Sequence, residues 1–492
     1  MINSIGIQTN NFAIQSTPAP AAAPKEGEIE FSYNPQDTMV MSPVTTGVSG
    51  VTVGKNGAIS TERVKLVNSD LKPNEDGSFV FDDKKDVKSF TAAHTFATVN
   101  KTLEMFENAM GQKVPWRSSR EQIYVNPDKG EMLNAYYSRS DCSVNFFHSL
   151  DPVSKEMVYS GHSGEAVSHE VGHAMLDGIR PNYLNAWSPD PLGFHESFAD
   201  CMGMFMATQN DETCEIAARE TGGDMKKENC IARTAEELGT AINTATGKNK
   251  TGGNYIRNAI NNWKWVDPKT LPENPGSDKL GTEMHNWSRV FTGAVYDTFA
   301  AIVHNKISEG MEPAAAIKAG GAEMIELYGN LMKEAPSGDF TYKQMANCML
   351  KADAKYMGGR NQEFIRDAFT ERRILPERNA NMELEATDAN DTGSQETKTL
   401  SVTLDGDGFG MFSGAKVETP AEANIYKAND GQAAADLKHN MKRLIAAGRI
   451  LYTEPNQKIE HKDMFDKDGR PYMGVVRWVD GNMVIERNTD IS

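Results

Sequence analysis

The run from 164 to 178, GEAVSHEVGHAMLDG, holds two histidines four positions apart with a glutamate directly after the first: His169, Glu170 and His173. On an α-helix, residues four apart project about 40° from one another, so the two imidazoles share one face. Two imidazoles in this arrangement can bind a zinc ion and leave positions for a third ligand and a water molecule. Glu170 lies beside them, where its carboxylate can accept a proton from that water. The pattern therefore predicts a zinc site suited to hydrolysis.

The ends of this run indicate a helix. Ser163 has the side chain of an N-cap, and Glu165 in the first turn meets the positive end of the helix dipole. Gly178 and then Pro181 mark the expected stop. The apolar residues that face the other way, which we expect to pack in the core, are Val167, Val171 and Ala174.

A third ligand is expected in the next helical segment. The spacing H-x-x-G-x-x-H is not met, because Leu176 and Ile179 stand at its Gly and its last His. The segment GFHESFAD (193–200) instead offers Glu196 and Asp200, again four apart on one helix face. Glu196 would complete a His₂Glu site, and Asp200 would accept the second N–H of a ligand histidine. The alternative interpretation is a solvated acidic face after a chance match to H-E-x-x-H.

Several segments of the chain resemble the thermolysin family of zinc metallopeptidases, the gluzincins. SHEVGHAMLDG resembles the zinc helix of that family, and HESFAD resembles its E-x-x-x-D helix. LNAYYSRSDCSVNFF resembles its edge strand, TAAHTFATVNKTLEMF the long helix before that strand, and HNWSRVFTGAVY a later helix. These segments keep the order and approximate spacing of the family from about Ser89 to Tyr356.

The resemblance implies roles for further residues. The Asn-Ala pair that binds substrate backbone in the family falls on Asn134 and Ala135. The histidine that stabilises the transition state falls on His285, whose alternative role is that of a surface or capping residue. Tyr183 and Arg233 are the nearest candidates for a tyrosine and an arginine of the family's cleft. The resemblance thus implies an endopeptidase that uses Zn²⁺ and acts on a peptide or protein substrate.

The expected fold class is α+β, a thermolysin-like two-lobed metallopeptidase with a small α+β module after it. Short β-branched stretches precede the histidine helix, and helical spacing dominates after it. The expected divisions are a disordered N-terminal arm (1–28), a β-rich lobe ending in the zinc-binding helix (29–180), a mainly helical lobe with the third ligand (181–378), a linker (379–397) and a module of unknown role (398–492).

Composition narrows the classes of partner and surroundings. The net charge of −17 opposes general binding to phosphate backbones, so nucleic acid is not an expected partner. No apolar run approaches the roughly 18 residues that span a bilayer. The N-terminal residues lack the basic start and apolar core of a secretory signal, and the five scattered cysteines are compatible with a reducing compartment. We expect a cytoplasmic protein or one exported by a non-classical route.

The chain departs from the thermolysin-like pattern in two places. Few residues precede the matching part, so a large inhibitory prosegment and autoprocessing are not expected. The stretch after E-x-x-x-D, CMGMFMATQ, is apolar, so a double calcium site is not expected either. The competing interpretation is a catalytically inactive zincin-fold protein with a binding or structural role, and the intact Glu170 speaks against it. A further possibility is that residues 398–492 deliver the enzyme to a partner or surface.

Overall fold

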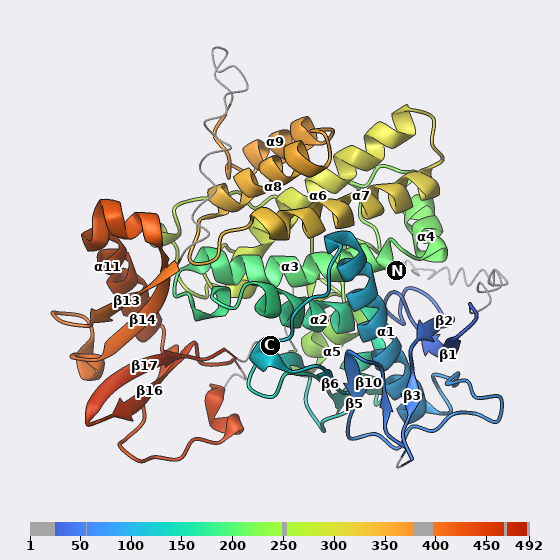
Figure 1. Ribbon diagram of the computed structural model, residues 1–492, viewed down its shortest axis with the longest axis horizontal. Helices are drawn as coiled ribbons and strands as arrows, with labels where there is room; N and C mark the ends of the chain where they lie inside the picture. Colours follow the sequence, from blue (N-terminus) through green and yellow to red (C-terminus); the bar gives the residue numbers. More distant parts are fainter. Residues whose placement is uncertain (1–24, 56, 248–252, 378–396, 467–469, 490–492) are drawn as a thin grey trace, which may run out of the picture.

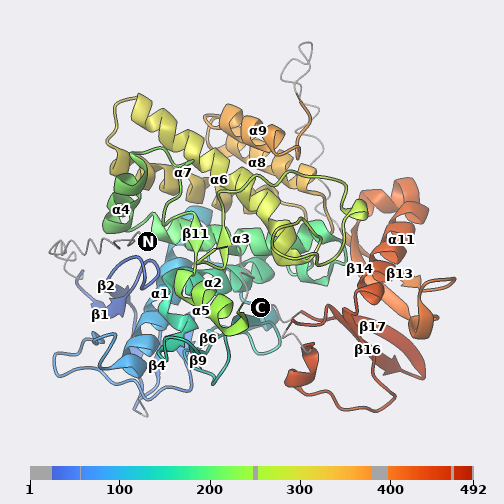
Figure 2. The same cartoon turned by 180° about the vertical axis from the view of Figure 1, so that it is seen from behind.

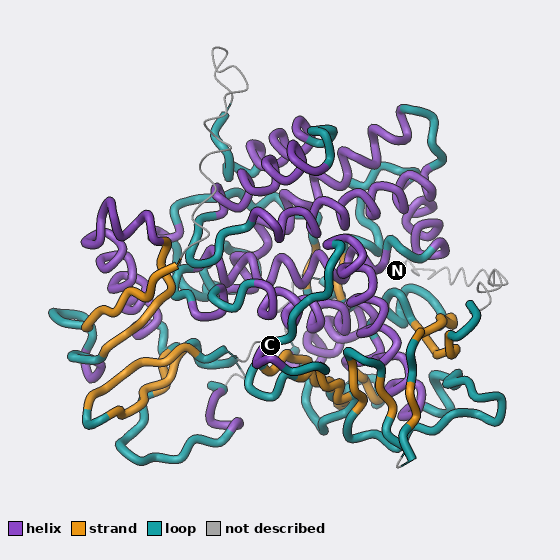
Figure 3. Tube along the Cα trace, viewed as in Figure 1, coloured by secondary structure: helices purple, strands orange, loops and turns teal. Residues whose placement is uncertain are grey.

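Helices and strands both build this protein, which has the mixed α+β fold predicted from the sequence. Strands gather in the N-terminal part and at the C-terminal end, while helices fill the middle (Figure 1, Figure 3). The arm predicted over 1–28 and the linker predicted over 379–397 lie almost wholly outside the described residues. The computed structural model describes residues 25–55, 57–247, 253–377, 397–466 and 470–489.

The N-terminal part is organised around a six-stranded sheet. Its strands, in spatial order, are β3 (Thr52–Val53), β4 (Ile59–Ser60), β5 (Val64–Leu66), β6 (Ile123–Asn126), β8 (Ser143–Phe146) and β7 (Ala135–Ser138). The long helix α1 (Val87–Met110) connects the parallel neighbours β5 and β6 and packs on both. The smaller pairs are β1 (Glu28–Tyr33) with β2 (Val44–Ser49), and β9 (His148–Leu150) with β10 (Met157–Tyr159). Strand β7 therefore ends the main sheet.

Two closely packed helices, α2 (Gly164–Ile179) and α3 (Pro189–Ala207), lie at the middle of the fold (Figure 1). They approach so closely at Gly172 that a Cβ there would lie 2.8 Å from the Ala199 Cα atom. Every residue of α3 is buried. Buried polar side chains need partners, so the polar residues of α3 are committed to contacts inside the protein.

The predicted start of the histidine helix is confirmed, and its predicted end is wrong. Ser163 is the N-cap, and its hydroxyl accepts a hydrogen bond from the Ala166 N–H. Gly178, predicted to stop the helix, lies inside α2, which continues to Ile179. Glycine serves a different purpose at 178, because a Cβ there would collide with the carbonyl oxygen of Pro115.

Further helices follow α3 along the chain. They are α4 (Asp211–Thr221), α5 (Glu236–Thr246), α6 (Met284–Ser308), α7 (Pro313–Glu334), α8 (Tyr342–Tyr356) and α9 (Gln362–Glu371). Helix α6 packs on α3, α7 packs on α6 and α1, and α8 packs on α7. A short pair of strands, β11 (Arg233–Thr234) and β12 (Arg257–Asn258), lies between α4 and α6 in the sequence. Through α6 and α7, these helices connect α3 to α1, which also packs directly on α2.

Residues 397–489 form a C-terminal module with its own sheet and helix. Its strands, in spatial order, are β13 (Thr397–Thr403), β14 (Lys416–Glu422), β17 (Asn482–Arg487), β16 (Gly474–Val479) and β15 (Ile450–Leu451). Helix α11 (Ala423–Ala446) packs on β13 and β14. The module is joined to the rest of the protein by direct contacts, and one of them is a hydrogen bond from the Trp187 indole N–H to the Glu418 carbonyl at 2.8 Å.

Candidate metal centre and cleft

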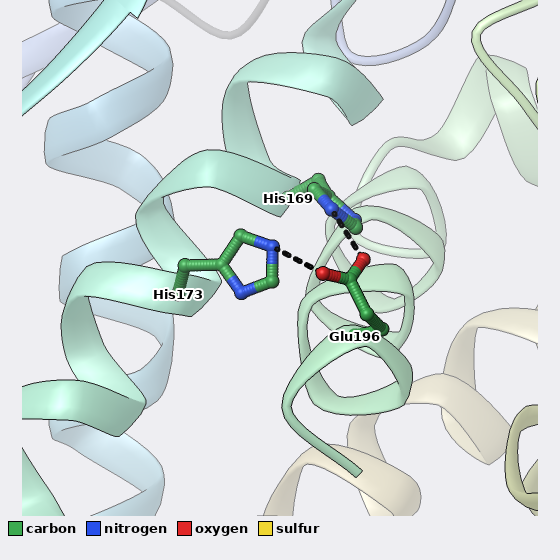
Figure 4. A group of neighbouring side chains, drawn as sticks. All are labelled: His169, His173 and Glu196. Carbon is green, nitrogen blue, oxygen red and sulfur yellow. Dashed lines mark ion pairs between the residues drawn. The ribbon is translucent and has the colours of Figure 1, made fainter. Parts of the chain in front are cut away.

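The structure brings His169, His173 and Glu196 together from two helices. One ligand atom of each lies within 4.8 Å of the other two. The Glu196 carboxylate is central, since one oxygen lies 3.5 Å from His169 Nε2 and the other 3.5 Å from His173 Nε2. Figure 4 shows the two imidazoles of α2 directed at this carboxylate on α3. In the described part of the chain, it is the only cluster of three or more such side chains that could hold a metal ion.

Most ligand atoms of this group lack a hydrogen-bond partner, which suits a bound metal ion; His169 Nε2 lies 3.3 Å from Arg257 Nη2. His173 Nε2 and both oxygens of Glu196 are buried and have no hydrogen-bond partner. A buried carboxylate without partners is costly, and a cation between these atoms would satisfy it. Two imidazoles and one carboxylate also form a donor set found in catalytic zinc sites. The group can therefore bind a metal ion, as predicted.

Nearby histidines keep Glu196 ionised. Burial alone would raise the pKa of its carboxyl, but His285, His173 and His169 together outweigh burial and lower that pKa far below its usual range. Only the ionised carboxylate is a good metal ligand, so the surroundings of Glu196 suit the role of third ligand.

Asp200 contacts His169, as expected from the helical spacing. Its Oδ1 lies 3.0 Å from His169 Nδ1, on the other side of the ring from Nε2, which lies 3.5 Å from Glu196 Oε2. Arg257 on β12 donates from Nε to both Asp200 oxygens at 2.9 Å. Burial opposes ionisation, but Arg257 and His169 lower the pKa of Asp200 to about 2. The carboxylate that orients His169 is therefore held in place by a cation.

His173 has an outer partner that the sequence reasoning missed. Its Nδ1 lies 2.8 Å from Nδ1 of His195, the residue just before Glu196. One of the two nitrogens must carry the hydrogen, because two lone pairs would repel at this distance. When His173 Nδ1–H is the donor, its Nε2 keeps the lone pair that a metal ion needs. The only signal for this contact in the sequence was that His195 directly precedes Glu196.

Glu170 faces the cleft but does not belong to the metal-binding group. Its side chain lines the cavity described below, and the residue is only 5% exposed. One carboxylate oxygen, Oε2, has no hydrogen-bond partner. Burial raises the pKa of Glu170 to about 7. A carboxylate with a pKa near neutrality is able both to accept and to release a proton at neutral pH.

His285, the second residue of α6, also reaches the metal-binding group. Its Nε2 lies 3.4 Å from Glu196 Oε2, and its Nδ1 lies 2.7 Å from Glu283 Oε1. Burial opposes protonation, but Glu196 and Glu283 raise the pKa of His285 to about 8. Glu283 is the N-cap of α6 and accepts a hydrogen bond from the Asn286 N–H. The cap therefore holds the imidazole as well as the helix.

A cavity of about 550 Å³ opens beside these groups. Asn134 and Ala135, at the start of β7, line it, as do His169, Glu170 and His285. Lining side chains that pack together as an apolar patch are Leu133, Ala166, Leu238, Ile242 and Ile256. Polar side chains on the lining include Asn258, Asn261, Asn274, Arg289 and Arg470. The volume and the mixture of apolar and polar walls are typical of a ligand-binding cleft.

The expected position of Tyr183 in the cleft is wrong. The Tyr183 side chain is fully buried, and its hydroxyl donates to the Pro336 carbonyl at 2.6 Å. Its ring packs against Phe340 and Phe194, and it is absent from the lining of the cleft. The segment between α2 and α3 turns inward at this point, so the tyrosine belongs to the core.

The expected position of Arg233 in the cleft is also wrong, and Arg257 occupies the cleft instead. Arg233 pairs with Glu236 at 3.1 Å and with Glu220 at 3.5 Å, and it does not line the cleft. In the β11–β12 pair, Thr234 stands opposite Arg257, and both line the cleft. Alternation along a strand then turns Arg233 to the other side. Nothing in the local sequence around Arg257 distinguished it beforehand.

Comparison with known proteins adds no family to this description. Neither a protein-family model nor a curated protein matches the chain. Within the described residues, no helix is both long enough and apolar enough to cross a membrane. The metal-binding group is therefore identified only from the side chains that this structure brings together.

Proposed function

We propose that the protein is a zinc-dependent endopeptidase with the two-lobed architecture of the thermolysin-like family. The observation that carries the proposal is the buried group of His169, His173 and Glu196, of which His169 lines the same cleft as Glu170. A purely structural zinc site is closed by a fourth protein ligand. Within the described residues, no fourth histidine, cysteine or acidic side chain has a ligand atom within 4.8 Å of all three of these ligand atoms. An open position next to a carboxylate favours hydrolysis over a structural role.

Zinc is the proposed ion because the two histidines and Glu196 match a donor set of catalytic zinc sites. When bound, zinc polarises a carbonyl group and lowers the pKa of a water molecule, which makes that water a nucleophile at neutral pH. Asp200 and His195 would orient the two ligand imidazoles through their outer ring nitrogens. The ligands are thus preorganised by neighbours on α3.

Glu170 is the proposed general base. Its side chain lines the cleft, one of its oxygens has no hydrogen-bond partner, and burial brings its pKa to about 7, close to neutral pH. A base whose pKa lies near the working pH is the most effective. Glu170 would take the proton from the attacking water and pass it to the amine that leaves the peptide bond.

His285 is the proposed donor to the carbonyl oxygen as that oxygen becomes negative. Glu283 accepts from Nδ1, which leaves Nε2 of His285 on the side of the metal-binding group. Arg257 lines the same cleft and lies 3.9 Å from Glu196, so it adds a second positive charge close to the reaction. Fixed positive groups around a developing negative charge lower the barrier of acyl transfer.

The proposed substrate is a peptide in an extended conformation. Strand β7 ends its sheet, and its first residue, Ala135, lines the cleft together with Asn134. The outer backbone groups of a terminal strand can pair with an extended peptide. The apolar patch at Leu133, Leu238 and Ile256 suits an apolar side chain of that peptide.

The test combines zinc analysis with digestion of a peptide library by the wild type and Glu170→Gln. We expect both proteins to hold zinc, and the variant to cleave at least about a hundredfold more slowly, because only the base is lost. Glu104→Gln, on the exposed surface of α1, is the matched control. Equal cleavage by wild type and Glu170→Gln, or none by the zinc-loaded wild type, would overturn the proposal and favour an inactive zincin-fold protein.

A further inference from the structure

The loop before α6 carries Glu283 and forms part of the cleft wall. We call residues 272–283 the wall loop, of which Asn274, Gly276, Ser277 and Glu283 line the cleft. The two ends of the loop pair with each other. The Thr282 N–H donates to the Pro272 carbonyl at 3.0 Å, and the Glu283 N–H donates to the Glu273 carbonyl at 2.7 Å. The position of Glu283 therefore depends on the position of Glu273.

Helix α6 holds the middle of the wall loop. The Asn286 side chain accepts from the Gly281 N–H at 2.8 Å and donates to the Lys279 carbonyl at 3.0 Å. Arg289, one turn further, donates to the Ser277 and Lys279 carbonyls. None of these contacts reaches Glu273, so the start of the loop needs a different support.

The C-terminal module supplies that support. Arg449, just before β15, is 2% exposed, and its Nε lies 3.3 Å from Glu273 Oε1. Arg443 of α11 donates to the Thr282 hydroxyl, at the other end of the loop. Figure 2 shows the segment before α6, in yellow-green, beside α11 and β14 of the module. The wall loop is therefore enclosed between α6 and the module.

The contact between Arg449 and Glu273 is a buried ion pair. Glu273 is 6% exposed, and Asp466 Oδ2 lies 3.8 Å from Arg449 Nη1. Removing one partner of a buried ion pair leaves an uncompensated charge, which forces the remaining side chain to move or to admit water. Loss of Arg449 should therefore displace Glu273, together with the backbone that holds Glu283.

We propose that the C-terminal module is a structural part of the cleft and that Arg449 is a positioning residue for His285. Arg449 holds Glu273, and the Glu273 carbonyl oxygen holds the Glu283 N–H. The Glu283 carboxylate then orients the His285 imidazole. The role of His285 rests on the proposed function, whereas the support of the wall loop does not. The module's Arg470 lines the same cleft, which agrees with a role at the site.

The positive charges of His285 and Arg449 favour an ionised Glu283 carboxylate. Burial would raise the pKa of Glu283, but His285 and Arg449 lower it. An ionised Glu283 is the stronger acceptor for the His285 Nδ1–H. Arg449 therefore supports the Glu283–His285 contact both through Glu273 and through its own charge.

The experiment compares full-length Arg449→Met and Arg449→Lys with the wild type. In Arg449→Met, we expect faster amide hydrogen exchange at Thr282 and Glu283, whose N–H groups close the loop. We also expect kcat to fall about tenfold with little change in KM, because outer partners of catalytic groups act on the reaction more than on binding. Arg449→Lys keeps the charge and should restore part of both properties. Glu273→Gln, which removes the same ion pair, provides a second route if Arg449→Met folds poorly.

Arg487→Met is the matched control. Arg487 is another arginine of the module at the interface, where it stacks on Trp187 and donates to the Ala186 carbonyl. Its loss should lower the melting temperature without changing loop exchange or kcat. Equal exchange and equal kcat in Arg449→Met, Glu273→Gln and Arg487→Met would overturn the proposal. If the wild type cleaved no peptide, the proposed function would fail, and loop exchange alone would still decide whether the module supports the loop.

Discussion

On one side of the cleft, α2 and α3 supply the metal-binding group from helices that follow each other closely in the sequence. The outer contact between His173 and His195 joins residues only 22 positions apart. On the other side, the wall loop is held by the C-terminal module, and the contact from Arg443 to Thr282 joins residues 161 positions apart. The metal side is thus local and helical, whereas the wall side is assembled from distant segments.

The two sides of the cleft have different chemical roles, metal binding on one side and action on the substrate on the other. Metal ligands must lie within a few tenths of an ångström of their ideal positions, and two packed helices provide that rigidity. In the proposed mechanism, the wall side supplies His285 and Arg257, which act on the substrate. It also supplies the Glu283 carboxylate, which orients His285. Damage to the metal side should therefore remove the metal, and damage to the wall side should leave it bound and slow the reaction.

The largest effect is expected for Glu196→Ala on the metal side. The substitution removes the carboxylate that lies 3.5 Å from each ligand imidazole. We expect loss of zinc and loss of detectable peptide cleavage, measured by metal analysis after dialysis and by a peptide assay. Glu107→Ala, which removes a carboxylate paired with Arg63 outside the cleft lining, is the control. Retention of zinc by Glu196→Ala would show that the ligand set is different.

A smaller effect is expected for Arg257→Met, because this residue contacts both the cleft and the partners of the metal-binding group. Arg257 lines the cleft, yet it holds Asp200 and through it His169. Since no ligand is removed, we expect zinc to remain bound while kcat/KM falls about ten- to hundredfold, as for other outer partners of metal ligands. Zinc analysis and steady-state kinetics on the same sample would measure both. Loss of zinc would instead assign Arg257 to the metal side.

The same contrast explains how much could be predicted from the sequence. The relation between His169, His173 and Glu196 was visible because helical periodicity is local, and four-residue spacing fixes which side chains share a face. The resemblance pointed to His285, which the structure brings to the same group. The α+β class likewise followed from local patterns.

The rest depended on contacts between distant segments. Arg257 reaches the cleft through the pairing of β11 with β12, and no local pattern distinguished it from Arg233. Tyr183 was misplaced because the path of an irregular segment is set by the core it meets, here Phe340 and the Pro336 carbonyl. The contact between Arg449 and Glu273 is equally non-local, and nothing in residues 398–492 indicated a part in the cleft.

The stability of the folded protein should also depend on pH, through the buried carboxyls near the start of α2. Burial raises the pKa of Glu236 from 4.5 to about 8 and that of Glu237 to about 7, and Asp37 beside them adds to both shifts. Burial likewise raises the pKa of Glu165 on α2. Stability from a raised pKa is complete below the unfolded value of 4.5 and is lost as the pH rises through the folded value. The folded protein should therefore become less stable toward pH 8.

The measurement is the melting temperature of the zinc-loaded wild type and Glu236→Gln between pH 6.5 and 8. Burial lowers the pKa of His94 to about 3 and of His162 to about 4, so the opposite contribution of these histidines is complete by pH 6.5. The amide introduced by Glu236→Gln does not ionise, and we expect the variant to lose less stability than the wild type across this range. Parallel curves for the two proteins would contradict the raised pKa of Glu236.

The smallest effect is expected for Arg289→Met on the wall side. Arg289 lines the cleft and stacks on Trp263, and no carboxylate lies within ion-pair distance of it in the described part of the chain. A peptide with a glutamate near this guanidinium should bind better than its glutamine analogue, by about two- to fivefold in KM, the size of a solvent-accessible ion pair. Arg289→Met should remove that preference, as should high salt.

The glutamate and glutamine peptides distinguish two effects of removing Arg289, the loss of a charge contact with the peptide and the loss of support for the wall loop. Arg289 also donates to the wall loop, so its loss could slow cleavage of every peptide. Loop damage would act equally on the glutamate and glutamine peptides, whereas loss of a charge contact would act only on the first. Burial lowers the pKa of Arg289, the Glu283 carboxylate opposes this, and the charge of Arg257 lowers it further; a peptide carboxylate would favour the charged guanidinium in the same way as Glu283. An unchanged preference in Arg289→Met would assign Arg289 to loop support alone, which is the role the module has in holding Glu273.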